Sequence, residues 1–403
     1  MNYDPYQPEY MDENDRGMGE YWESPVEVDP SPPIITYLLI AINVIVWLLE
    51  MFLGGSENIQ VLIRMGAKEN SLIAAGQYWR LLTPVFLHAG IDHLLFNSFG
   101  LLMWGRYIEA LFGKGKYLFI YLVSGLTGSL ASYLFSPAVS VGASGAIFGL
   151  FGTLLYFRKS RRRMFHQIFG VQVIIIIALN LFNGFTRPGI DNWGHIGGLI
   201  GGFLAASSVG LLGDRKIHWQ KMMAWGILLL AFYLGLPYGQ IKYQGEQDKR
   251  LAYHYYEAGD YGKAEEYGLR AKAQKPQDRE LDQFLSEVYF RQGAQAYDAK
   301  DLEEAEAAIE KSLQYERKNS RAHLVKAFIH IERRDFESAE EAAWEAVRWA
   351  EDDDSGYAYY VLGFTQYHQG EIREARKSLT HAINLDPSLE EARELLKLLD
   401  RTQ

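Results

Sequence analysis

The sequence predicts an all-α protein in which a polytopic membrane bundle of helices is followed by a soluble array of helical repeats. Two observations predict this fold class. Apolar runs long enough to cross a bilayer, or nearly so, recur between residues 34 and 238. Amphipathic helical patterns follow at a period of about 34 residues. At 403 residues the chain has room for two or three domains.

The composition and the N-terminal segment limit the classes of function. The chain has no cysteines, which excludes disulfides and thiolate metal sites. The net charge of -10 comes from the N-terminal segment and the C-terminal third, and nucleic-acid binding has no support. Residues 1–33 are acidic and contain several prolines, with Arg16 as their single basic residue, so we expect a disordered cytoplasmic tail. This tail is a solvated leader or, alternatively, a docking segment.

Seven runs are predicted to span the membrane, at about residues 34–53, 92–112, 116–135, 144–157, 169–186, 194–212 and 221–238. Basic residues follow the second, fourth and sixth runs, which puts the N-terminus in the cytoplasm and the region after the seventh run outside the cell. We therefore predict a six-helix core at residues 34–212 and a seventh transmembrane helix at residues 213–240. Gly226, Gly235 and Pro237 interrupt the last run. If that run does not cross, the C-terminal region is cytoplasmic instead.

The connection between the first two runs is long for a membrane loop. From Gly54 to Pro84 it mixes apolar and charged residues, so we expect a partly embedded amphipathic element. Trp79-Arg80 closes this element, and an aromatic ring beside a cation suits the level of the lipid headgroups.

Residues 241–403 carry a local pattern that recurs four times. In each copy an acidic residue lies four positions before an alanine; these alanines are Ala264, Ala305, Ala339 and Ala375. A small residue follows each alanine by seven positions, and Pro276 and Pro387 follow the first and last copies. The pattern resembles tetratricopeptide repeats. The resemblance implies a concave surface for a protein or peptide partner; the alternative is a module that serves only stability or spacing.

Ser144 is the candidate nucleophile. It follows Gly142-Ala143, precedes Gly145, and begins the fourth apolar run. A helix from Ser144 to Phe157 covers roughly 21 Å, whereas a bilayer core needs about 30 Å, so the serine is expected below the outer membrane surface. A hydroxyl at that depth needs a water-filled cavity.

Other polar residues are predicted on the same side of the membrane. His195 begins the sixth run, and His93 and Asn97 lie one helical turn apart at the start of the second, just after His88. A serine needs a base to become a nucleophile, and a neutral imidazole supplies one near pH 7, so His195 is the candidate base. The candidate oxyanion donors are the ring N–H of His93, the carboxamide of Asn97 and the backbone N–H of Ser144.

Glycines indicate how these groups come together. Gly145 and Gly149 recur at a spacing of four in the fourth run, and Gly198 and Gly202 do so in the sixth. Small residues at this spacing let two membrane helices approach closely. Phe148, one turn after the serine, is then expected to pack on the histidine ring.

Each of these features has a plainer interpretation when it is taken alone. The glycines around the serine are common in helix packing, and His195 is compatible with a simple interhelical hydrogen bond. A metal site made by His88, His93 and His195 lacks the carboxylate or H-E-x-x-H motif that accompanies many such sites. The joint occurrence of the features, in this order and on one side of the membrane, is what the plainer interpretations do not explain.

Taken together, the motifs closely resemble those of the rhomboid intramembrane serine proteases, over about residues 34–212. They are Trp79-Arg80, His88-x4-His93-x3-Asn97, Gly142-x-Ser144-Gly145 and His195-x2-Gly198-x3-Gly202. The resemblance implies a Ser-His dyad with Ser144 as nucleophile, His195 as general base, and His93 and Asn97 as oxyanion stabilisers. It implies supporting roles for Gly142, Gly145, Phe148, Gly198, Gly202 and His88. Phe148 stands where the family often has tyrosine, so ring stacking is expected to survive and a hydroxyl contact is not.

The resemblance implies a serine endopeptidase that needs no cofactor and no metal. Its expected partners are the lipid bilayer, transmembrane protein substrates cut near their outer ends, and a protein or peptide ligand on the repeats. The main alternative is a catalytically silent adaptor that binds membrane clients with the core and recruits partners through the repeats. A transporter is a further alternative, but residues 34–238 show no convincing internal repeat.

Overall fold

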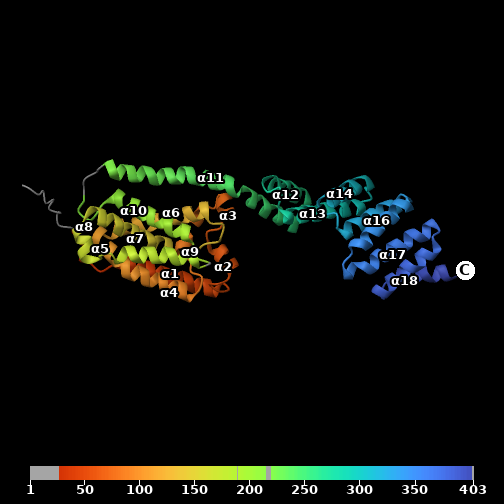
Figure 1. Ribbon diagram of the computed structural model, residues 1–403, viewed down its shortest axis with the longest axis horizontal. Coiled ribbons are helices and arrows are strands. Elements are labelled where there is room, and N and C mark those ends of the chain that lie inside the picture. Colours follow the sequence, from red (N-terminus) through yellow and green to blue (C-terminus); the bar gives the residue numbers. More distant parts are fainter. Residues whose placement is uncertain (1–26, 188, 215–218, 402–403) are drawn as a thin grey trace, which may run out of the picture. The chain divides into compact units, whose positions relative to one another are not determined.

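A computed structural model describes residues 27–187, 189–214 and 219–401. The predicted disorder of the N-terminal tail therefore lies mostly outside the described residues. So do Arg215 and Lys216, two of the basic residues that follow the sixth apolar run. The described residues form helices and turns, and contacts divide the chain into two compact units, residues 1–240 and 241–403 (Figure 1). The all-α prediction is confirmed.

The first unit is a bundle of helices joined by short turns (Figure 1). Its elements are α1 (Ile34–Phe52), α2 (Ile59–Met65), α3 (Asn70–Ala74), η1 (Tyr78–Leu81), η2 (Thr83–Phe86), α4 (Ile91–Gly100), η3 (Leu101–Gly105), α5 (Arg106–Phe112), α6 (Lys114–Phe135), α7 (Ser144–Ser160), α8 (Arg162–Ile168), α9 (Gln172–Thr186), α10 (Asn192–Val209) and α11 (Trp219–Glu257). Each predicted apolar run falls on helical structure. The seventh falls on α11, which stays helical through Pro237 and extends past the run into the second unit.

By length and composition alone, three helices in the described part of the chain can each cross a membrane. They are α1, α6 and α11; α8 and α9, bent by 74° at their junction, make a fourth if the pair is one span. The other predicted runs lie on helices that are shorter or less apolar. These include α7, which has 17 residues, and α10, which carries asparagine and histidine in its first turn.

Helices α6, α7 and α10 form the centre of the first unit, and each packs against the other two. Aromatic and aliphatic side chains fill the space around them; Tyr117, Tyr121 and Phe157, for example, are completely buried. The peripheral helix α1 is tied to this centre by a carboxylate. Glu109 of α5 accepts hydrogen bonds from the backbone N–H groups of Ile35 and Thr36, at 2.9 Å each, and so caps the first turn of α1.

The connection between α1 and α4 is folded rather than extended. It contains the short elements α2, α3, η1 and η2. The expectation that Arg80 reaches the lipid headgroups is wrong. Its side chain is buried and donates to the carbonyl oxygens of Ile63 and Ala67, because those backbone acceptors would otherwise be left unpaired inside the connection. Trp79 is half-exposed, with the Arg80 guanidinium 4.4 Å from its ring centre.

The second unit consists of paired helices that follow the end of α11. They are α12 (Tyr261–Gln274), α13 (Arg279–Asp298), α14 (Leu302–Tyr315), α15 (Ser320–Glu332), α16 (Phe336–Trp349), α17 (Asp352–Gln369), α18 (Ile372–Leu385) and α19 (Glu390–Arg401). The four alanines of the recurring pattern are completely buried between paired helices. The acidic residue before three of them, Asp260, Asp301 and Asp335, caps its helix by accepting from a backbone N–H three residues later.

Candidate active site

Ser144 begins α7 and is half-buried, with Gly142 just before it. Gly142 has a φ of +120°, a conformation that residues with a side chain rarely adopt, and its N–H donates to the carbonyl oxygen of Pro84 at 2.8 Å. This turn presents the serine at the helix start. The first backbone N–H groups of a helix have no partner within it, so those of Ser144 and Gly145 are available to a developing negative charge.

His195 lies in the first turn of α10 and faces the serine. Its Nε2 is 2.9 Å from Ser144 Oγ, a hydrogen-bonding distance. The ring of Phe148 lies parallel to the imidazole, with centroids 4.1 Å apart and an interplanar angle of 8°. His195 Nδ1 is buried, and in the described ranges no side chain or backbone group hydrogen-bonds to it. The arrangement is a serine–histidine pair whose imidazole is held by stacking rather than by a carboxylate.

Close contact between α7 and α10 makes this distance possible. A Cβ atom built on Gly198 would lie 1.9 Å from the carbonyl oxygen of Gly145, and one on Gly202 would lie 2.0 Å from that of Gly149. Atoms cannot approach so closely, so only glycine fits at these two positions of α10. The glycine spacing thus places the starts of two helices side by side.

The other predicted site residues lie on α4 and just before it. The His93 ring contacts Gly142: a Cβ built there would lie 2.6 Å from His93 Nε2. Asn97 is buried and its Nδ2 donates to the carbonyl oxygen of His93 at 2.8 Å, which leaves its second N–H hydrogen for another acceptor. His88 packs edge-on against His93, with centroids 5.3 Å apart, and its backbone N–H donates to Glu50 at 3.1 Å. His93 therefore lies beside Gly142, just before Ser144, whereas Asn97 and His88 contact His93.

Phe148 offers a test of the stacking contact. Phe148→Ala is expected to lower the turnover rate about five-fold, since a stacked aromatic pair contributes roughly 1 kcal/mol and a loosened imidazole spends less time near Oγ. Phe148→Tyr keeps the ring and should change the rate less than three-fold. The measurement is kcat for cleavage of a reporter substrate. Equal rates for the alanine and tyrosine variants would contradict a role for the stacked ring.

Three residues near the site were missed in the sequence. Asp191 precedes α10 and accepts from the N–H of Gly194 at 3.0 Å; an aspartate at a helix start is a recognisable cap signal. Glu50 is a completely buried carboxylate in α1, and an acidic residue inside an apolar run is a signal in itself. Lys68, also buried, lies in the first connection and gave no signal, because two of its three acceptors are backbone carbonyl oxygens far along the chain.

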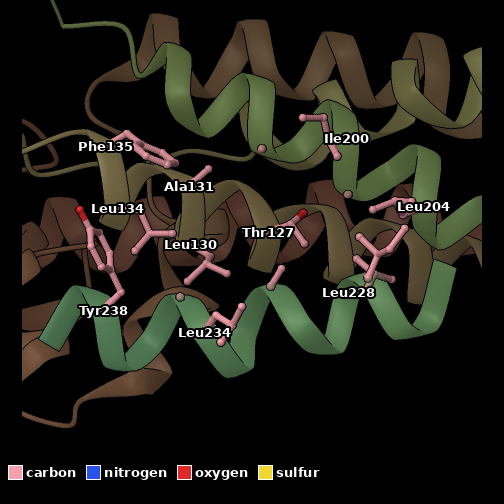
Figure 2. Close-up of a pocket in the computed structure, with 15 residues that line it drawn as sticks. Thr127, Leu130, Ala131, Leu134, Phe135, Ile200, Leu204, Leu228, Leu234 and Tyr238 are labelled. Atoms are coloured by element: carbon pink, nitrogen blue, oxygen red, sulfur yellow. The ribbon is translucent and has the colours of Figure 1, made fainter. Parts of the chain in front are cut away.

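Two cavities in the first unit differ in chemistry. The smaller, about 20 Å³, is lined by Ser144, His195, Asp191 and neighbouring backbone, and is large enough for about one water molecule. The larger, about 550 Å³, lies between α6, α10 and α11; Figure 2 shows that leucine and other apolar side chains line it. It does not include the serine, so the chemistry belongs to the smaller cavity. Within the described ranges no group of three histidine or acidic side chains is placed to hold a metal ion.

Comparison with known proteins gives matches to both units. The Rhomboid domain profile matches residues 75–211, and a tetratricopeptide-repeat profile matches residues 356–389. Rhomboid protease GluP of Bacillus subtilis (strain 168) is 40% identical over 304 residues, which are 75% of this chain and 58% of that protein. Putative rhomboid protease YdcA of the same organism is 37% identical over 175 residues, 43% of this chain and 86% of that protein.

Solved structures of tetratricopeptide-repeat proteins are among those similar to this chain. The first TPR of Spaghetti bound to an HSP90 peptide is 19% identical, with a TM-score of 0.29; the match covers 30% of this chain and 94% of that one. The chain spans 58% of the length of GluP but most of the length of YdcA, with 86% of the latter matched. This chain belongs to the rhomboid family and carries tetratricopeptide repeats after its rhomboid domain.

Proposed function

We propose that the chain is an intramembrane serine endopeptidase that cleaves transmembrane segments of other membrane proteins. The observation that carries this proposal is the 2.9 Å contact between Ser144 Oγ and His195 Nε2 at the starts of two packed helices. The names of the relatives GluP and YdcA, both described as rhomboid proteases, support the same activity.

In the acylation step, Ser144 Oγ attacks the carbonyl carbon of the scissile peptide and its proton passes to His195 Nε2. The carbonyl electrons move to the oxygen, which becomes an oxyanion. The backbone N–H groups at the start of α7 face this charge, and His93 lies close enough to Gly142 to add a ring N–H. Collapse of the intermediate breaks the C–N bond, and His195 returns the proton to the leaving amine.

In the deacylation step, a water molecule attacks the acyl-enzyme while His195 Nε2 takes its proton. The carbon–Oγ bond then breaks, the proton returns to Ser144, and a carboxylic acid leaves. The small polar cavity beside the dyad has room for one such water, and Ser140 and Asp191 lie in its wall. Preferred substrates are helices with glycine or proline near the cut, because an intact helix hides its carbonyl groups.

The remaining parts of the chain are assigned around this activity. Residues 34–212 form the catalytic core, residues 213–240 the seventh transmembrane helix, and residues 241–403 a repeat domain that captures a protein or peptide partner. The positive-inside pattern supports a cytoplasmic N-terminus and an extracytoplasmic repeat domain.

The test uses the purified full-length chain in lipid vesicles with a tagged single-span reporter substrate. A cut inside the reporter's transmembrane segment is expected, and a fluorophosphonate probe should block it by modifying Ser144, as located by mass spectrometry. If the chain cuts nothing and Ser144 stays unmodified, the protease proposal fails and a non-catalytic adaptor that binds membrane clients becomes the better interpretation.

A further inference from the structure

Lys68 is a buried cation with no role in the proposed chemistry, and it lies between α2 and α3. Its side chain is 1% exposed. The ammonium group donates three hydrogen bonds: to Asn70 Oδ1 at 3.0 Å, to the carbonyl oxygen of Ser136 at 3.0 Å and to that of Ala138 at 2.6 Å. All three ammonium hydrogens are thus used, two of them on a segment almost seventy residues further along the chain.

That segment, residues 136–143, is the non-helical stretch that leads from α6 to Ser144. It is fastened to the first connection by further bonds. Asn70 Nδ2 donates to the carbonyl oxygen of Ser136 at 2.9 Å, and the backbones of Lys68 and Ser140 exchange two hydrogen bonds, at 3.0 and 3.1 Å. Three residues separate Ser140 from Ser144, so these contacts fix the backbone path that leads to the serine.

We propose that Lys68 is a positioning residue for Ser144: its ammonium group holds residues 136–140 against the first connection, and this sets the backbone of Gly142 and Ser144 against His93 and His195. The inference rests on the proposed protease function. A displacement of about 1 Å in reacting groups can cost roughly 100-fold in rate, so a contact that lies outside the dyad is able to control turnover.

Charge supports the assignment. Burial lowers the pKa of Lys68 from its ordinary value of 10.5 to about 8, and the nearby carboxylates of Asp191 and Glu69 oppose that effect. Asp191 also caps the start of α10, the helix that carries His195, so the Lys68 ammonium interacts with a carboxylate at that helix start. Above about pH 8 the neutral amine keeps two hydrogens for three acceptors, and one acceptor loses its partner.

The first test compares variants of the full-length chain in vesicles. Lys68→Met is expected to lower kcat at least ten-fold with little change in KM, because the proposed role of Lys68 is to position the nucleophile and not to bind substrate. Lys68→Arg, which retains a charged donor, should recover much of the rate. Lys116→Met is the matched control, because the Lys116 ammonium also binds two backbone carbonyls, those of Gly210 and Leu211. Lys116 lies about 18 Å along α6 from Gly128, the residue of that helix that lines the small cavity with Ser144 and His195.

The second test is the pH profile. For the unaltered chain kcat should fall above about pH 8, and for Lys68→Arg this fall should be absent, since a guanidinium stays charged. Global stability changes in the opposite direction. Because the folded-state pKa lies below the unfolded one, Lys68 makes the folded state more stable as pH rises from about 8 to 10.5. A rate that falls in this window therefore does not report unfolding through Lys68.

Hydrogen exchange supplies a readout that needs no catalysis. The amides of Ser140 and Gly142 should exchange faster in Lys68→Met than in Lys116→Met, at equal melting temperatures. The inference is overturned if the two methionine variants show the same kcat, or if exchange at residues 136–143 is unchanged. If the unaltered chain cuts nothing, the protease function and this inference are both overturned. If the unaltered chain is active and Lys68→Met has the same kcat, the inference alone is overturned.

Discussion

Ser144→Ala is expected to abolish cleavage, with kcat lowered by roughly 10⁴-fold or more. His195→Ala should cost about as much, because an alcohol with no base at 2.9 Å is a poor nucleophile. The two residues act as a unit, so the double variant should be no slower than either single variant. The measurement is product formed per enzyme from a reporter substrate in vesicles, with expression and melting temperature matched among the variants.

Two control substitutions separate loss of the dyad from general damage. Ser160→Ala removes a hydroxyl at the other end of α7, and His166→Ala removes an exposed imidazole on α8. Both should leave cleavage within about two-fold of the unaltered chain, because Ser160 lies about 24 Å along α7 from Ser144 and His166 is exposed on α8. Cleavage that persists in Ser144→Ala, or losses that multiply in the double variant, would contradict a serine–histidine unit.

Gly202→Val is expected to give the second largest effect. A single Cβ at this position would lie 2.0 Å from the carbonyl oxygen of Gly149, and 2.5 Å from its Cα, so α7 and α10 would have to separate. Overpacking of this kind costs about 1–3 kcal/mol or more, and a shift of about 1 Å at the dyad costs roughly 100-fold in rate. We expect a lower melting temperature. Because a 100-fold loss of rate leaves about 1% of the activity, we expect cleavage at or below roughly that level.

Gly226→Val provides the matched control for this prediction. Gly226 lies in α11, where a Cβ would meet no atom within 4 Å, so the same substitution adds the same side chain without a clash. It should leave both melting temperature and cleavage nearly unchanged. If Gly202→Val behaves like Gly226→Val, then the close approach of the two helices is not what holds the dyad together.

The helical architecture was predictable because its signals are local. Apolar runs and the recurring alanines mark the helices of both units, and the structure forms helices at each of them. Membrane crossing was less predictable. Many residues of α10 are buried among the other helices of the bundle. Its length and composition therefore do not need to match those of a span that faces lipid.

The candidate site was predictable in its residues but not in its contacts. Ser144, His195 and the glycines between their helices stand out by type and spacing. Asp191 was also predictable, as an aspartate that caps the start of a helix. The network around Lys68 was not available, since its acceptors are mostly backbone carbonyl groups, which every residue carries.

The sequence by itself determined the helices, the repeats and the identity of the candidate nucleophile and base, because periodicity and motif spacing act over a few turns of chain. Only the tertiary structure decided that Oγ and Nε2 lie 2.9 Å apart across 51 positions, and that Lys68 binds Ser136 across 68. The physical reason is range. A hydrogen bond forms within a few tenths of an ångström, and that separation is set by how whole helices pack, which no local pattern records.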